Sequence, residues 1–312
     1  MVAITKNVDD VIDKYNILLD KLQSLINSSG KKTNIYNTKL GEYKRNFEKL
    51  EELNDADLAN LAGKINDYNF IYEIFDNENI QYNKSELLKI IEGQHDDYQH
   101  RSNDILFEFS MAVRFAISTK NIAKINLDTE CDVIVNESAA IECKCLHNEA
   151  RINDNVRKAI NQINKRIADG QAKYGLVALD LSNVAVSESD KKVIYDLFYK
   201  FADDFQKITN SGTSVCKMVI QNNNFASIAR AFLSHCIEAK FYQNLSKSLV
   251  EDKMSNHIKA IIYQASVYFV FSYDDICIPV PIRFMNYLIN PNLTSDESDD
   301  IKEKIHSLEV GY

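Results

Sequence analysis

Between residues 102 and 222 the apolar residues change their spacing from one segment to the next, and this alternation limits the fold more than any other feature of the sequence. Spacings of three and four predict helices, whereas short β-branched runs between polar residues predict strands. The predicted elements are a helix over 103–117, strands over 123–127, 131–135 and 139–146, a helix over 153–169, a strand over 174–181, a helix over 190–205 and a strand over 216–221. This order predicts an α/β fold with a mixed central sheet flanked by helices.

The remainder of the chain after residue 222 reads as an elaboration of the same domain. Residues 225–249 have helical spacing, and residues 260–280 are rich in β-branched and aromatic side chains. We therefore expect one further helix and then two strands joined by a turn at Asp274-Asp275. The acidic segment after Pro291 is expected to pack loosely.

Residues 1–95 form a helical region that precedes the predicted core domain of residues 96–312. Apolar residues recur at spacings of three and four from Val8 to Ile26 and again from Leu40 to Leu50, with a Ser-Ser-Gly break between the two runs. This pattern predicts a helical hairpin. We expect the hairpin to pack on its own chain, and the alternatives are a homodimer interface or an element that contacts substrate. The polar stretch 93–97 is the predicted boundary.

Composition and charge narrow the classes of partner. The formal net charge of −9 argues against a large non-specific nucleic-acid footprint, although it allows a local basic face. The most apolar stretch, residues 260–270, contains two polar residues and is too short to span a bilayer. Together with a start that lacks the layout of a secretory signal, this predicts a cytoplasmic protein with no membrane partner.

Six cysteines are present, and none forms a Cys-x-x-Cys pair, so we expect reduced and mostly buried thiols. Cys143, Cys145 and His147 form the pattern in the sequence that comes nearest to a zinc-binding motif. Their spacing differs from that of the usual structural zinc sites. The expected metal chemistry therefore lies elsewhere.

Two charged residues interrupt the apolar strand predicted over 139–146. Side chains alternate across a strand, so Glu142 and Lys144 point to the same face. Polar residues 136–138 predict a tight turn, and the resulting hairpin brings Asp132 next to this pair. Buried charges are costly unless a partner or a ligand uses them. The alternative is a solvated ion pair on a half-exposed strand.

Oxygen atoms in this hairpin suit a hard divalent cation. Asp132, Glu142 and the backbone carbonyl of Cys143 are the oxygen ligands that Mg²⁺ prefers, and Mn²⁺ is the expected substitute. A metal held there would lower the pKa of its bound water and clamp a phosphate group. Lys144 would then hold or deprotonate the attacking water, or neutralise the charge on the phosphorane.

Asp132, nine residues and then Glu142-Cys143-Lys144 resemble the PD-(D/E)xK motif of restriction-endonuclease-like nucleases, over residues 102–222. Cys131 stands where the nominal motif has proline. The resemblance implies the restriction-endonuclease-like fold and Mg²⁺-dependent hydrolysis of phosphodiesters. It further implies that DNA rather than RNA is the expected substrate and that endonuclease rather than exonuclease activity is expected. A role in restriction or phage defence would fit this resemblance.

The resemblance also implies supporting residues in the two flanking helices. Glu108 lies in the preceding helix, where the superfamily often has an acidic residue, and it would support the metal or the water. Gln162 lies in the following helix, where a polar residue often joins the site. Arg166 stands four residues later, where RecB-like sequences often carry tyrosine.

Three more residues of that following helix are candidate nucleic-acid contacts, namely Asn155, Arg157 and Lys158. A solvated helix face is the alternative for each of them. For the whole protein, the alternative function is a nucleic-acid-binding or protein-interaction module that has the same fold and does not cleave.

Overall fold

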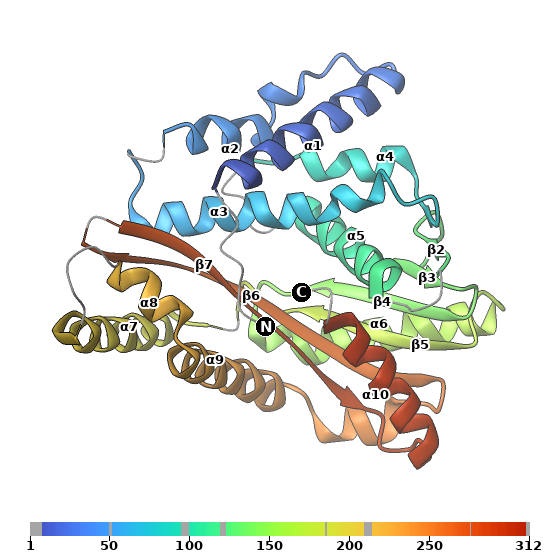
Figure 1. The fold of residues 1–312 in the computed structure, drawn as a ribbon. Helices are drawn as coiled ribbons and strands as arrows, with labels where there is room; N and C mark the ends of the chain where they lie inside the picture. The colour runs from blue at the N-terminus through green and yellow to red at the C-terminus, as the bar shows by residue number, and fades with distance from the viewer. Residues whose placement is uncertain are drawn as a thin grey trace.

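The computed structural model describes residues 8–49, 52–94, 100–118, 123–184, 186–208, 214–274 and 276–309. Within these ranges seven strands form one mixed sheet with helices on both faces (Figure 1). The strands are β1 (Ile80–Gln81), β2 (Ile125–Asn126), β3 (Val133–Val135), β4 (Ala139–Cys145), β5 (Tyr174–Asp180), β6 (Ile258–Tyr273) and β7 (Ile276–Ile289). The predicted α/β fold with a mixed sheet and a helical N-terminal region is confirmed.

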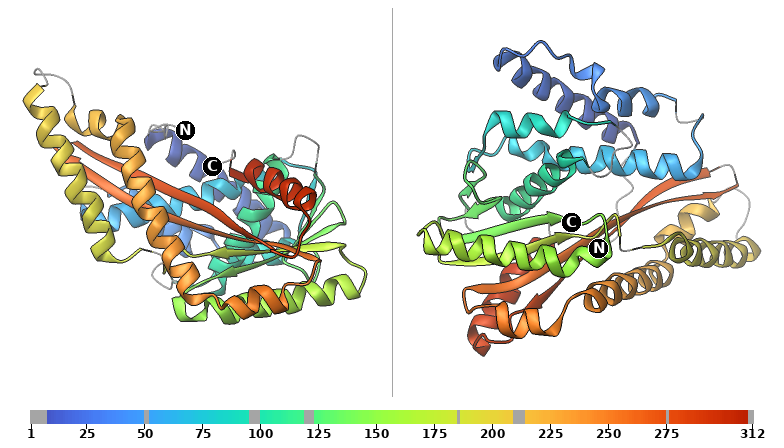
Figure 2. Two further views of the ribbon diagram at one scale, coloured as in Figure 1. Left: turned by 90° about the horizontal axis from the view of Figure 1, so that it is seen from below. Right: turned by 180° about the vertical axis from the view of Figure 1, so that it is seen from behind.

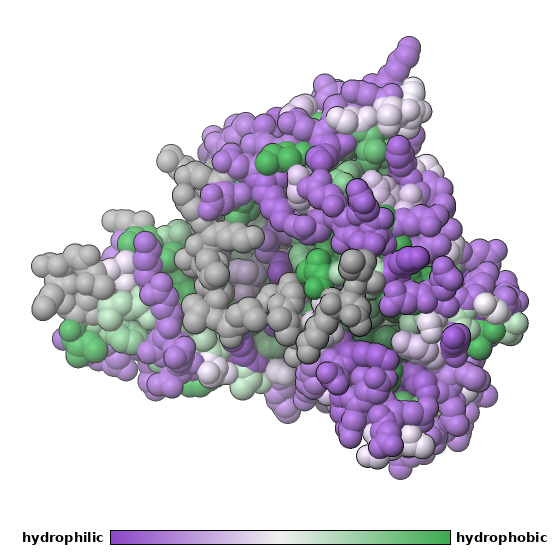
Figure 3. Space-filling model, turned by 45° about the vertical axis from the view of Figure 1, so that its right-hand side comes forward, coloured by the Kyte–Doolittle hydropathy of each residue, from purple (hydrophilic) through white to green (hydrophobic). Residues whose placement is uncertain are grey.

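The described helices cover the sheet from two sides. They are α1 (Val8–Ser28), α2 (Lys39–Phe47), α3 (Asp55–Phe70), α4 (Lys84–Leu87), α5 (Arg101–Ser118), α6 (Ile152–Ala168), α7 (Glu188–Ile208), α8 (Val215–Gln221), α9 (Asn223–Asn244) and α10 (Ser295–Glu309). Figures 1 and 2 show α1 to α5 on one face and α6 to α9 on the other. On the face drawn in Figure 3, hydrophilic side chains cover most of the described surface.

The strands lie side by side in chain order, from β1 to β7. The pairs β2–β3, β3–β4 and β6–β7 are antiparallel, and the pairs β1–β2, β4–β5 and β5–β6 are parallel. A parallel pair needs a crossover connection, and α6 supplies it between β4 and β5. The apolar face of α6, with Val156, Ile160 and Ile163, packs under β5 and β6 in one buried cluster.

The predicted hairpin between β3 and β4 is present. Asn136 and Glu137 both have a φ of 52°. The amide of Ser138 donates a hydrogen bond to the carbonyl of Val135 over 3.0 Å. Two successive residues with positive φ match the twist of an antiparallel pair. The turn therefore fixes the register that pairs Val133 with Ile141.

The N-terminal helices belong to the same hydrophobic core as the sheet. In α1, Tyr15, Leu19 and Ile26 of the predicted apolar seam are fully buried within this chain. β1, which the sequence did not predict, joins the sheet beside β2, so both the sheet and the core extend across residue 95. A homodimer stays a prediction and would have to use another surface. Residues 95–97 of the predicted boundary lie outside the described residues.

One predicted strand is a helix. Residues 216–221 lie in α8, which begins after Ser214, whose side chain accepts a hydrogen bond from the Lys217 amide over 3.3 Å. The buried residues Val215, Cys216 and Val219 have helical spacing. A short apolar run fits a buried strand and a buried helix equally well, which is why the sequence prediction failed here.

The acidic C-terminal segment is also different from the expectation of loose packing. It forms α10, and Thr294 and Glu297 cap its start by reciprocal hydrogen bonds of 3.1 Å and 3.4 Å. Ile301, Ile305 and Leu308 are buried in the core that α5 also shares. Three apolar residues within about two turns thus outweigh the acidic composition of the exposed face.

The helix and the two strands predicted after residue 222 are present. The predicted helix over 225–249 is α9, which ends at Asn244, and a short π-helical turn follows over Leu249–Lys253. The predicted final strands are β6 and β7, and residue 275 of their turn lies outside the described residues. None of the described helices combines the length and the apolar character needed to cross a membrane.

We predict that Ile305→Ala destabilises the protein by about 2–5 kcal/mol, because it leaves a cavity where a 1% exposed side chain now packs. Urea unfolding followed by circular dichroism measures this change. Ile208→Ala is the matched control, because Ile208 is 77% exposed and its truncation should shift stability by no more than about 0.5 kcal/mol. Equal stability of the two variants would contradict the docking of α10.

Candidate functional site

The candidate site lies where the pairing of β3 with β4 ends. The register that pairs Val133 with Ile141 would place Asp132 opposite Glu142 one step further on. Instead, the side chain of Asp132 turns toward β4, and its Oδ2 accepts a hydrogen bond of 2.7 Å from the amide of Cys143. A side-chain carboxylate therefore replaces the next rung of the strand ladder.

Lys144 bridges the two carboxylates. Its Nζ lies 3.5 Å from Oδ2 of Asp132 and 3.4 Å from Oε2 of Glu142. The carboxylates of Asp132 and Glu142 therefore contact the same ammonium group from two sides. The structure therefore brings together the three residues that the motif predicted.

The carbonyl of Cys143 faces the same edge as the two carboxylates. Both main-chain groups of a strand residue point to the same neighbouring strand. Because the amide of Cys143 donates to Asp132, its carbonyl also points toward the side where β3 has ended. This placement agrees with the predicted role of the Cys143 carbonyl as an oxygen ligand.

Glu142 is the most deeply buried charged group at the site. Its side chain has no exposed area, and its Oε1 has no hydrogen-bond partner among the described residues. Burial and then the charge of Asp132 raise the pKa of Glu142 to about 7, against the opposing effect of Lys144. An unsatisfied buried carboxylate oxygen is costly, so this atom has the properties of a ligand that awaits a cation.

Lys144 remains the positive charge of the site. Burial lowers its pKa, but Asp132 and Glu142 outweigh burial, and the pKa of Lys144 is raised overall. The ammonium group is therefore protonated at neutral pH. This favours the predicted charge-neutralising role of Lys144 over its predicted role as a base.

Helix α5 adds two carboxylates from the other face of the sheet. Glu108 is the acidic residue predicted for this helix, and burial followed by the charge of Asp132 raises its pKa to about 8. Asp104 lies one helical turn earlier, on the same side of α5. Its pKa is raised by burial, while His147 and Lys144 lower it. Asp104 stands at the start of the helix predicted over 103–117, and no role in the site was predicted for it.

The candidates on α6 are not joined to this cluster by hydrogen bonds or ion pairs within the described residues. Gln162 is half-buried, and Lys158 is exposed. Arg157 pairs with Asp154. The side chain of Asn155 donates to the carbonyl of Arg151, the residue before α6, over 2.9 Å. Their catalytic and nucleic-acid roles stay predictions.

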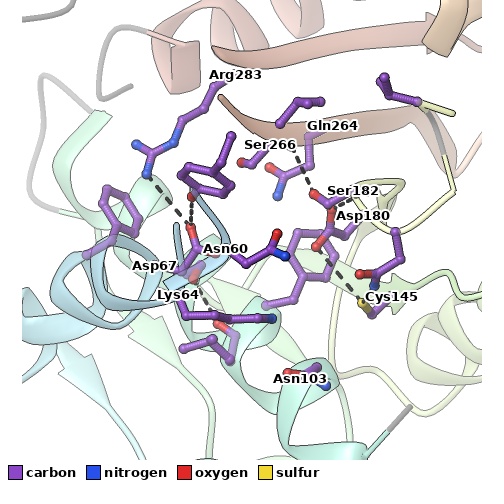
Figure 4. Close-up of a pocket in the computed structure, with 18 of the residues that line it drawn as sticks. Asn60, Lys64, Asp67, Asn103, Cys145, Asp180, Ser182, Gln264, Ser266 and Arg283 are labelled. Carbon is purple, nitrogen blue, oxygen red and sulfur yellow. Dashed lines mark hydrogen bonds and ion pairs between the residues drawn. The ribbon is translucent and has the colours of Figure 1, made fainter. Parts of the chain in front are cut away.

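A cavity of about 470 Å³ opens beside the cluster, between α3, α5, the ends of β4 and β5 and the middle of β6 and β7 (Figure 4). Two buried polar residues, Arg114 of α5 and Gln264 of β6, form part of its wall. The Arg114 side chain donates a hydrogen bond to the side-chain oxygen of Gln264. Asp67 of α3 accepts a 2.6 Å hydrogen bond from Tyr268. In the sequence, polar residues within apolar segments, such as Arg114 in α5 and Gln264 in β6, were the signal of this cavity.

Asp180 connects the cavity with the end of β4. Its Oδ2 lies 3.9 Å from the Sγ of Cys145. Its Oδ1 accepts a 3.0 Å hydrogen bond from the amide of Ser182. Burial raises the pKa of Asp180, despite these hydrogen bonds.

Comparison with protein-family models, with curated proteins and with solved structures finds no match to the chain. The case for a function therefore depends on the geometry of the site. Asp132, Glu142 and the Cys143 carbonyl form an oxygen donor set, and the unpartnered Glu142 Oε1 gives that set a reason to bind a cation. The residues present thus fit Mg²⁺ or Mn²⁺.

We predict that the metal-free protein loses stability as pH rises from about 4.5 toward 7. The pKa of Glu142 is about 7 in the folded protein against an ordinary 4.5, so the folded state holds this proton more tightly than the unfolded chain does. Its contribution to the free energy of unfolding is fully present below pH 4.5 and is lost through pH 7. The loss amounts to ~3 kcal/mol at 1.36 kcal/mol per pKa unit.

Urea unfolding in a chelator-containing buffer, compared between the wild-type protein and Glu142→Gln, isolates this effect. The difference in stability between the two proteins should change in favour of Glu142→Gln across this pH range, because glutamine does not titrate. A difference that stays constant from pH 4 to pH 8 would contradict the proposed burial of the charge.

Proposed function

We propose that the protein is a metal-dependent nuclease that hydrolyses phosphodiester bonds, with DNA as the expected substrate and internal cleavage as the expected mode. The observation that carries this proposal is the fully buried Glu142, whose Oε1 has no partner among the described residues, while Lys144 lies between its other oxygen and Asp132. Ordinary surface ion pairs do not have this burial.

The order of the elements adds support. A helix with Glu108, the antiparallel strands β2 to β4, the crossover helix α6 and the parallel strand β5 follow each other as the resemblance to PD-(D/E)xK nucleases implies. The motif residues Asp132, Glu142 and Lys144 fall at the point where β3 separates from β4.

In the proposed reaction, Asp132 and Glu142 would hold the cation, together with the Cys143 carbonyl. When bound, the metal would lower the pKa of a water molecule and polarise the scissile phosphate. Lys144, which is protonated, places its charge where the phosphorane develops negative charge. The charges of Asp132 and Lys144 both act on the pKa of Glu108, so Glu108 is placed to orient the water or to support the metal.

We predict that Asp132→Asn and Lys144→Met each lower Mg²⁺-dependent cleavage of DNA by about a hundredfold or more. Asparagine keeps an oxygen that can accept the Cys143 hydrogen bond but removes the charge, so this variant should also bind Mn²⁺ more weakly. Methionine removes only the ammonium group, so Lys144→Met should bind Mn²⁺ at least as tightly as the wild-type protein. Gel-based cleavage assays and calorimetric Mn²⁺ titrations measure the two effects.

Lys165→Ala is the control for these variants, because Lys165 is an exposed lysine of α6 outside the cluster. It should cleave at the wild-type rate. If the wild-type protein binds Mn²⁺ but cuts neither DNA nor RNA, single- or double-stranded, the nuclease proposal fails. The alternative of a module that binds without cleavage then takes its place.

We predict that Lys158→Ala weakens DNA binding in a way that depends on salt. Loss of one phosphate contact should reduce the slope of log affinity against log salt by about one, whatever the DNA sequence. Fluorescence anisotropy in chelator-containing buffer at several salt concentrations gives this slope, and Lys165→Ala again serves as the control on the same helix. Identical slopes for the two variants would remove Lys158 from the contact surface.

A further inference from the structure

Three side chains with different ligand atoms meet beside the carboxylate cluster. Asp104 comes from the first turns of α5, Cys145 is the last residue of β4, and His147 lies in the connection that follows. One ligand atom from each lies within 4.8 Å of the ligand atoms of the other two, and all three side chains are half-buried. The sequence analysis had grouped His147 with both Cys143 and Cys145, and here Asp104 takes the place of Cys143.

This arrangement has the donor set of a borderline-soft cation. Thiolate, imidazole and carboxylate are the ligands of Zn²⁺, whereas Mg²⁺ and Mn²⁺ prefer oxygen alone. Two anionic ligands and one neutral imidazole balance the charge of a divalent cation. The two donor sets lie near each other, yet they differ in chemistry.

The surroundings offer a candidate fourth ligand and room for a bound molecule. The side-chain amide of Asn183 lies 3.7 Å from the Sγ of Cys145 and 3.4 Å from Nδ1 of His147, so it already spans two of the three groups. Rotation of this amide by half a turn would present its oxygen to the same two groups. Cys145 and His147 also line the cavity of about 470 Å³, which gives room for a water or ligand at an open coordination position.

We propose that Asp104, Cys145 and His147 bind one Zn²⁺ ion, at a site separate from the oxygen ligands of Asp132 and Glu142. Without metal, the Cys145 thiol lies 3.9 Å from Asp180, to which it donates. On binding, the S–H bond breaks, the Zn–S bond forms, and the proton leaves to solvent through the cavity. Three protein ligands leave one of four tetrahedral positions for Asn183, water or a bound molecule.

A cation at this site would link α5 to the end of β4. Asp104 and Glu108 are one helical turn apart, so the ion would hold the α5 carboxylates against the strand that carries Glu142 and Lys144. The three ligands are therefore positioning residues for the neighbouring cluster. This inference does not depend on nuclease activity.

The test is Co²⁺ and Zn²⁺ binding by the full chain after removal of metals with a chelator. Co²⁺ should produce a thiolate-to-cobalt charge-transfer band in the near ultraviolet, and Zn²⁺ should displace it with a stoichiometry of one ion per chain. Cys145→Ser and His147→Ala should each weaken Zn²⁺ binding by roughly tenfold or more. Cys145→Ser should also abolish the charge-transfer band.

Matched controls separate this site from other thiols and from the carboxylate cluster. Cys236→Ser removes another half-buried cysteine, on α9, and His235→Ala removes an exposed histidine of the same helix. Both should keep the band and the Zn²⁺ affinity. Asp132→Asn should also keep the charge-transfer band, although it is expected to bind Mn²⁺ less well.

A band that is absent from the wild-type protein, or that survives Cys145→Ser, overturns the proposal. If Cys145→Ser does not fold, alkylation of the wild-type protein decides the question. Zn²⁺ should then slow the modification of Cys145, identified by peptide mass spectrometry, and leave that of Cys236 unchanged. Equal rates of Cys145 modification with and without Zn²⁺ would refute the site.

Discussion

The burial of one carboxylate constrains the centre of this structure. Glu142 lies in the middle of the sheet with no exposed area, and its charged form is unfavourable there unless positive charge is close by. Lys144, two residues further along β4, supplies part of that charge. The early end of β3 leaves open the edge where a cation would supply the remainder. Asp132 makes this end possible, because its side chain satisfies the Cys143 amide that β3 no longer reaches.

Strand β4 separates two kinds of chemistry through the alternation of its side chains. Glu142 and Lys144 align with Val177 and Leu179 of β5, whose side chains pack on the α6 side of the sheet. Cys143 aligns with Ala178, which packs on the side of α5. Adjacent residues of one strand can therefore present a hard oxygen ligand to one face and a thiol to the other.

The sequence predicted the parts of this site that depend on local spacing. The turn at 136–138, the alternation along β4 and the apolar stripe of α6 are short-range patterns, and they placed Asp132, Glu142 and Lys144 together. Asp104 could not be found in this way, because its relation to Cys145 and His147 depends on how α5 packs. The cavity is still less local, since Asp67 and Tyr268, which hydrogen-bond across it, are 201 residues apart. For α10, the Thr294 and Glu297 capping pair was a readable signal that the acidic composition obscured.

The packing of α10 has a consequence for the order in which the molecule can mature. Ile301, Ile305 and Leu308 share one buried cluster with Ile105 and Phe109 of α5, the helix that carries Asp104 and Glu108. During translation, α5 emerges from the ribosome almost two hundred residues before these partners do. Helix α5 therefore acquires its full set of neighbours only after residues 295–309 have been made. A shorter nascent chain carries the motif residues, but its α5 lacks the packing against α10.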